Sequence, residues 1–175
     1  MLNRGGANLN HSVGYNLEAE GFIKYNPIIS HLLSAEKVEL ITRSVLDTEC
    51  GIDAIAKIQK QHYFVSLRFR QTNKDYNSFT TSRHITTFGN ELKKWLYNKV
   101  RPDFFIQITE IGNSVRIIEV NVDSFILFIQ KLIKDNTLQA YWNENLKSYE
   151  FKLDNILQGD NGIRNYLIDK SQVFT

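Results

Sequence analysis

This sequence has little cysteine, and it lacks long apolar runs and closely paired histidines. Cys50 is the only cysteine among 175 residues, so neither an internal disulfide nor a multi-cysteine zinc site can form. The four histidines are scattered, without the close spacing of a zinc hydrolase. No uncharged apolar run reaches about 18 residues, and the N-terminus lacks the apolar stretch of a signal peptide. We therefore expect a cytoplasmic protein that does not enter the membrane.

The chain does contain enough apolar material for a packed core. Hydrophobic residues make up 42% of the positions and aromatic residues 12%, which suits one domain of ordinary size. We predict a single domain over residues 1–175, with its core at about residues 17–134 and a C-terminal extension over residues 135–175.

Charge is unevenly distributed along the chain. The net charge is only +2, but residues 57–101 hold ten basic and two acidic side chains, a balance of +8. The segments before and after each carry a balance of −3. A basic segment between acidic ones can form a local positive surface, for which the phosphates of nucleic acid are the natural partner. The alternative is that the basic side chains only coat solvated faces.

The first half of the chain predicts a helix followed by three strands. The helix begins either near Leu17 or at Asn26, where Asn26-Pro27 is typical of a helix start. Alternating apolar residues then predict strands over residues 38–44, 52–58 and 63–70, adjacent and antiparallel. The polar stretch 71–87 is predicted to be a loop.

The second half predicts helices and strands in alternation. Apolar residues at helical spacing indicate a helix from Phe88 that ends before Pro102. Strands over residues 103–109 and 115–120 surround a Gly112-Asn113 turn, and a helix capped by Asp123 or Ser124 follows. An edge strand over residues 149–153 and a short helix over residues 163–170 complete the chain. This order predicts an α/β sandwich, with a mixed sheet between helices.

An acidic residue lies at the start of one of these strands, and two arginines lie on the next strand. Asp53 lies at the start of one strand, in a hairpin-like stretch that runs from Leu46 to Arg70 and begins with an acid cluster. On the next strand, Ser66, Arg68 and Arg70 share one face because strand side chains alternate.

This pattern resembles the PD-(D/E)XK nuclease superfamily, whose members carry an acid at one strand start and Glu or Gln, any residue, then Lys on the next strand. Gly51-Ile52-Asp53 followed by Ser66-Leu67-Arg68 is similar to that motif, and the resemblance covers residues 17–110. It implies a restriction-endonuclease-like fold with an α-β-β-β-α-β core. It also implies a magnesium-dependent endonuclease, a hydrolase of phosphodiester bonds in DNA.

The resemblance also implies roles for individual residues. Asp53 is the expected Mg²⁺ ligand, and Glu18 or Glu20 in the first helix is the expected second acid. Asp53, Ser66 and Arg68 form the candidate catalytic set. We expect DNA contacts from four basic side chains: Arg68, Arg70, Lys74 and Arg83.

Two departures from the motif leave the activity open. Ser66 stands where Glu or Gln is expected, and its hydroxyl is a poorer metal ligand than either. Arg68 stands where Lys is expected and cannot transfer protons, because a guanidinium keeps its protons in proteins. One alternative is a nucleic-acid-binding module that has lost catalysis. Another is a regulatory or structural subunit whose basic face binds an acidic protein. A homodimer is compatible with all three.

Overall fold

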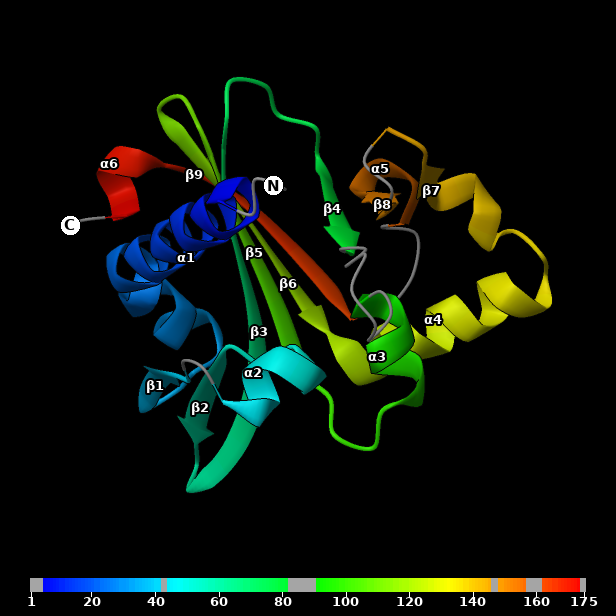
Figure 1. Cartoon of the computed structure of the whole chain (residues 1–175), viewed down its shortest axis with the longest axis horizontal. Coiled ribbons are helices and arrows are strands. Elements are labelled where there is room, and N and C mark those ends of the chain that lie inside the picture. Colours follow the sequence, from blue (N-terminus) through cyan, green and yellow to red (C-terminus); the bar gives the residue numbers. More distant parts are fainter. Residues whose placement is uncertain (1–4, 42–43, 82–90, 146–147, 157–161, 174–175) are drawn as a thin grey trace.

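The computed structural model describes residues 5–41, 44–81, 91–145, 148–156 and 162–173, with side chains except at 5–18, 48 and 156. Its centre is a six-stranded sheet in the order β1-β2-β3-β5-β6-β9 (Figure 1). The strands are β1 (Lys37–Leu40), β2 (Ala54–Ile58), β3 (Gln61–Thr72), β5 (Phe104–Ile111), β6 (Ser114–Asn121) and β9 (Ile163–Asp169).

The sheet is mixed. Strands β1, β2 and β3 pair antiparallel, as predicted. Strand β5 then lies parallel to β3, with Arg68 opposite Gln107. Strands β5 and β6 form the predicted hairpin, and Gly112 takes a positive φ of 55° at its turn.

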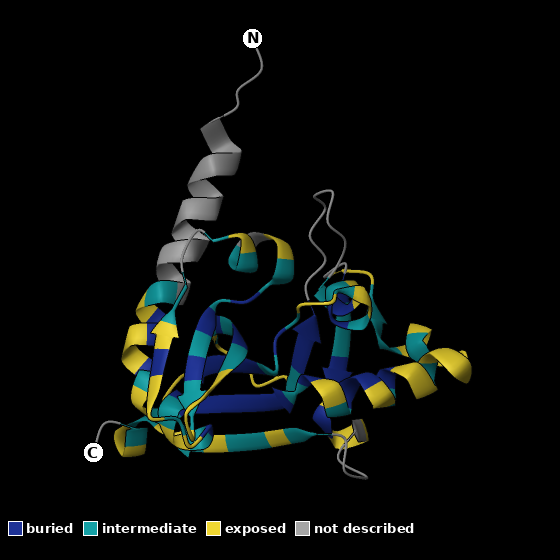
Figure 2. Cartoon of the chain, turned by 90° about the horizontal axis from the view of Figure 1, so that it is seen from below, coloured by how far each residue is buried: buried dark blue, intermediate teal, exposed yellow. Residues whose placement is uncertain are grey.

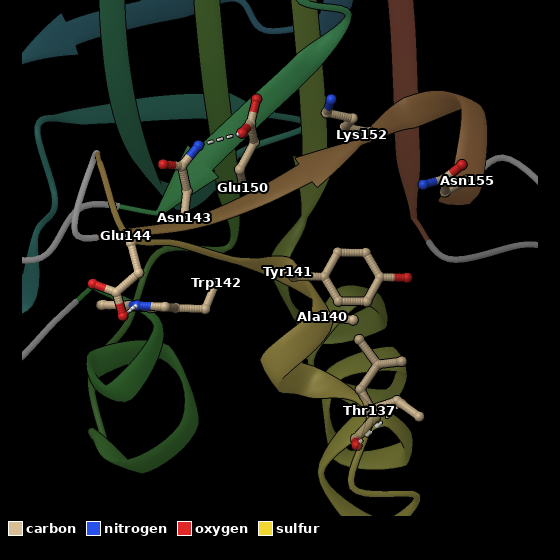
Figure 3. A pocket seen from close by; sticks show the side chains of 10 residues that line it. Thr137, Ala140, Tyr141, Trp142, Asn143, Glu144, Glu150, Lys152 and Asn155 are labelled. Atoms are coloured by element: carbon tan, nitrogen blue, oxygen red, sulfur yellow. Dashed lines mark hydrogen bonds between the residues drawn. The ribbon is translucent and has the colours of Figure 1, made fainter.

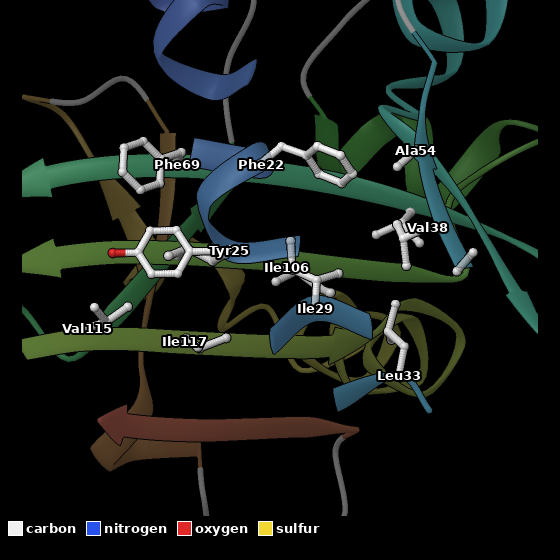
Figure 4. Close-up of a cluster of buried hydrophobic side chains, with 13 residues drawn as sticks. Phe22, Tyr25, Ile29, Leu33, Val38, Ala54, Phe69, Ile106, Val115 and Ile117 are labelled. Carbon is white, nitrogen blue, oxygen red and sulfur yellow. The ribbon is translucent and has the colours of Figure 1, made fainter. Parts of the chain in front are cut away.

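One long helix, α1 (Gly5–Leu32), covers one face of this sheet. Both predicted helix starts are therefore wrong, since Leu17 and Asn26 lie inside it. Phe22, Tyr25 and Ile29 recur at helical spacing and pack on the strands (Figure 4). Pro27 does not end the helix. Ile23, whose carbonyl has no N–H partner at Pro27, is 73% exposed, so this turn of the helix faces solvent.

A short helix, α2 (Val45–Cys50), forms in the acidic part of the hairpin-like stretch, and β2 and β3 form the hairpin after it. The predicted strand over residues 38–44 stops at Leu40. Ser44 instead caps α2, because its hydroxyl accepts a hydrogen bond from the Asp47 N–H at 3.2 Å. Gly51 ends the helix in the left-handed conformation, with φ 66°.

The other face of the sheet is covered by helices and a second, three-stranded sheet in the order β4-β8-β7. Strand β4 lies inside the predicted loop, and β8 is the central strand of this sheet, although an edge strand was predicted. Asn121, not Asp123 or Ser124, caps α4. The elements of this layer are β4 (Ser78–Thr81), α3 (Glu91–Tyr97), α4 (Val122–Lys134), the 3-10 helix η1 (Leu138–Tyr141), β7 (Trp142–Asn143), β8 (Ser148–Lys152) and α5 (Leu153–Ile156).

The predicted helix over residues 163–170 is wrong, because these residues form β9, and only α6 (Lys170–Val173) is helical. Tyr166 and Ile168 pack against the core beneath α1, while Leu167 is exposed. Pairing with β6 decides the conformation. Residues 135–175 therefore contribute strands to both sheets.

Two hydrophobic cores lie on the two faces of the central sheet. One is beneath α1, and the other joins Phe105 and Ile118 of the sheet to Trp95 of α3 and Phe125 of α4. Figure 2 shows the buried central strands between more exposed outer elements. The prediction of an α/β fold with a mixed sheet between helices is confirmed.

No helix among the described residues is both long and apolar enough to cross a membrane.

Candidate functional site

Asp53 is fixed immediately before β2. Its N–H donates to the Val65 carbonyl at 2.9 Å, and its carbonyl accepts from the Ile41 N–H at 2.7 Å. Its carboxylate oxygen Oδ2 accepts a hydrogen bond from the Leu67 N–H at 2.6 Å and one from the Ser66 hydroxyl at 3.2 Å. The structure thus brings together Asp53 and Ser66, which the sequence motif paired.

A second carboxylate reaches Ser66 from α3. The Ser66 hydroxyl lies 3.5 Å from Oε1 of Glu91, in the first turn of that helix. Asp53, which precedes the basic segment, and Glu91, which lies within it, therefore converge on one buried hydroxyl. Sequence reasoning missed Glu91. One signal was available, because Glu91 and Asp75 are the only acidic residues between positions 57 and 101.

Arg68 is held by Glu91, one of these two carboxylates. Its guanidinium donates to Oε2 of Glu91 at 2.7 Å and also to the Thr80 carbonyl of β4. The guanidinium carbon lies 5.4 Å from the centre of the Phe105 ring. The Arg68 and Glu91 side chains are only 13% and 10% exposed. Arg68 shares a face with Ser66 as predicted, but β4 and α3 cover that face.

Of the other predicted DNA contacts, Arg70 contacts the same residue of β4 as Arg68 does. Arg70 donates to the Thr80 hydroxyl and is half-buried. Lys74 is exposed in the loop before β4, with its ammonium 5.5 Å from the Tyr76 ring centre. Arg83 lies outside the described residues.

The first-helix glutamates are not placed beside Asp53. Glu20 is exposed on α1, which covers the face of the sheet opposite to Ser66 and Arg68. Glu18 also belongs to α1, but its side chain lies outside the described part of the chain. The second acid at Ser66 comes from α3 instead.

Two carboxylates can hold a hard metal ion. Magnesium takes one or two protein carboxylates and completes its shell with water and phosphate oxygens. Asp53 and Glu91 supply such oxygens at Ser66, so the donor chemistry fits Mg²⁺. Within the described residues, no group of three or more His, Cys, Asp or Glu side chains could hold a metal.

A second polar cluster surrounds Glu110, at the end of β5. Its buried carboxylate accepts hydrogen bonds from Lys24 and Tyr25 of α1, and from Gln71 of β3 at 3.2 Å. Lys170 lies 3.4 Å away. Burial alone would raise the pKa of Glu110, but the hydrogen bonds from Lys24 and Tyr25 and the nearby lysine charges lower it to about 2. Burial and Glu110 raise the pKa of Tyr25.

Searches of protein-family models, curated proteins and solved structures found no match to this chain.

Proposed function

We propose that this chain is a nuclease-fold protein that acts on DNA and hydrolyses phosphodiester bonds with Mg²⁺. The observation that carries the proposal is the convergence of the Asp53 and Glu91 carboxylates on Ser66, with Arg68 beside Glu91. The order of elements supports it as well. When α2 and β4 are set aside, helix α1, antiparallel β1 to β3, helix α3 and parallel β5 follow the α-β-β-β-α-β order of the restriction-endonuclease-like core.

Each residue of the site has a defined part in this proposal. Asp53 and Glu91 would hold Mg²⁺, which when bound polarises a phosphate and favours a hydroxide nucleophile. The Ser66 hydroxyl has one proton, which it donates to Asp53 at 3.2 Å or to Glu91 at 3.5 Å. Arg68 stays protonated, so it donates hydrogen bonds to a phosphate and cannot act as the base. The proton of the attacking water must therefore pass to solvent or to a phosphate oxygen.

Cleavage of supercoiled and single-stranded DNA with Mg²⁺ or Mn²⁺ tests the proposal. We expect Asp53→Ala and Glu91→Gln to slow cleavage at least about 100-fold, because each removes charge from the reacting centre. Glu20→Gln is the matched control, since Glu20 is exposed on the opposite face. Cleavage that is absent in the unaltered protein, or equal in all three variants, contradicts the proposal.

The ion pair between Arg68 and Glu91 favours a second candidate, a DNA-binding module without catalysis. In this candidate, the Arg68 guanidinium stays bound to the Glu91 carboxylate and to the Thr80 carbonyl. This candidate predicts DNA binding that weakens steeply with salt, because phosphate neutralisation releases counterions, and no cutting with any divalent metal. If no DNA binds even near 50 mM salt, a protein partner with an acidic surface becomes the better proposal.

A further inference from the structure

A hollow lies in the layer formed by residues 132–155, on elements that the candidate nuclease site does not use (Figure 3). It is bounded by the end of α4, by η1, and by strands β7 and β8. Its volume is about 660 Å³, within the range of roughly 300–1,000 Å³ that small-molecule sites occupy. The hollow is therefore large enough for a nucleoside.

Two aromatic rings on this hollow are held in place but only half-buried. The Trp142 indole N–H donates to Oε1 of Glu144 at 2.7 Å, and its ring meets Tyr149 edge to face at 5.1 Å. Tyr141 stacks on Phe151, with ring centres 5.2 Å apart. Ring orientation is thus fixed before any ligand arrives. Fixed aromatic rings of this kind are platforms on which flat ligands stack.

The polar side chains of the hollow offer donors and acceptors together. Glu150 is anchored, since it accepts from the Asn143 amide at 2.7 Å and from the Ser78 hydroxyl at 2.9 Å. Each carboxylate oxygen can accept a further hydrogen bond. Asn155 and Lys152 add an amide and an ammonium (Figure 3). Amide and carboxylate groups are those that read the hydrogen-bonding edge of a base.

Charge decides which part of a nucleotide enters. Among the lining residues that the structure describes, Glu144 and Glu150 against Lys152 give a charge balance of −1, which disfavours phosphate. We propose that this hollow binds a nucleobase, either of a free nucleoside or of an unpaired base in a strand, with the phosphate left outside. Strand β4 links it to the candidate nuclease site, because Thr80 pairs with Glu150 and its carbonyl accepts from Arg68. The biological role of the pocket rests on the proposed function, but base binding itself does not.

Fluorescence titration without metal tests the pocket directly. The chain has two tryptophans, of which Trp95 is fully buried and reports on the fold. We expect deoxyadenosine or another deoxynucleoside to quench Trp142 emission saturably, and a 5′-phosphate to add no affinity. Trp142→Phe should abolish the quenching while calorimetry still detects binding. Trp142→Ala should weaken binding about 5- to 150-fold, the value of one base-stacking contact.

Oligonucleotides distinguish the two sources of the base. Quenching by single-stranded but not by fully paired DNA identifies an unpaired base of a strand, whereas quenching by nucleosides alone identifies a free ligand. The proposal is overturned if no deoxynucleoside quenches at millimolar concentration, if Trp142→Ala binds equally well, or if a neutral hexose binds instead. Asp53→Ala must leave nucleoside binding unchanged. DNA cleavage without nucleoside binding would refute the pocket alone, and nucleoside binding without cleavage would refute the nuclease alone.

Discussion

The Glu110 carboxylate makes the stability of this protein sensitive to acid. Its pKa is about 2 in the folded chain, against an ordinary 4.5. A carboxyl with a lowered folded pKa contributes stability above its unfolded pKa and loses that contribution as pH falls through the folded one. We expect the free energy of unfolding to fall by up to about 3 kcal/mol between pH 4.5 and 2 from this group.

Glu110→Gln should flatten that dependence and lower stability at pH 7, because the neutral amide no longer pairs with Lys24 and Lys170. Urea unfolding at a series of pH values measures both effects. Glu39→Gln is the control, since Glu39 forms only an exposed pair with Lys37. If the free energy of unfolding of Glu110→Gln depended on pH as steeply as that of the unaltered protein, the ion pairs of Glu110 would not stabilise the fold.

Gly21 marks a close approach of α1 to the sheet. A Cβ at this position would overlap the Phe69 ring of β3. Alanine is the better helix former by about 1 kcal/mol, yet we expect Gly21→Ala to destabilise by roughly 1–3 kcal/mol, because overpacking outweighs that gain. Thermal unfolding of the two proteins measures this loss of stability. In a Phe69→Leu background, the same change should cost less, and an equal cost in both backgrounds would refute the steric explanation.

At the scale of elements, β4 is attached to the central sheet by side chains. The buried Gln107 amide donates to the Ser78 carbonyl at 3.2 Å, and its oxygen accepts from the Thr80 N–H at 3.4 Å. Gln107→Leu leaves both backbone groups without these partners, so we expect a loss of roughly 1–3 kcal/mol. Hydrogen exchange should accelerate in β4 and β8 more than elsewhere. Gln61→Leu, at an exposed position, is the control, and uniform acceleration across the sheet would contradict this local role.

The same attachment explains why the sequence did not reveal β4. Phe79 faces the core, while Thr80 faces Arg70 and Gln107. Because a strand with polar partners needs no alternation of apolar and polar residues, its sequence does not show the pattern from which a strand is predicted. By contrast, the hairpin around Gly112 and strands β2 and β3 were predictable, because turn chemistry and alternation agree there.

Part of the candidate site was predictable for the same reason. Asp53, Ser66 and Arg68 lie on adjacent strands, whose alternation fixes which side chains share a face. Glu91 was not predictable by this reasoning, since only the packing of α3 against the sheet brings it to Ser66.

At the scale of the whole molecule, the C-terminal 41 residues are needed for both layers. Phe151 and Leu153 are fully buried in the core between the sheets and α4, and β9 completes the central sheet. We expect a chain that ends at residue 134 to lack cooperative thermal unfolding, because it leaves apolar surface of β6 and α4 exposed. Near-ultraviolet circular dichroism measures this. A cooperative transition in the shortened chain would show that residues 1–134 fold independently.

The Glu110 cluster ties the first described helix to the last one. Lys24 reaches this carboxylate from α1, and Lys170 reaches it from α6. An event that releases Glu110 from its partners loosens both helices together. Proteolytic nicking of α1 around Lys24 should therefore rise and fall with nicking of α6.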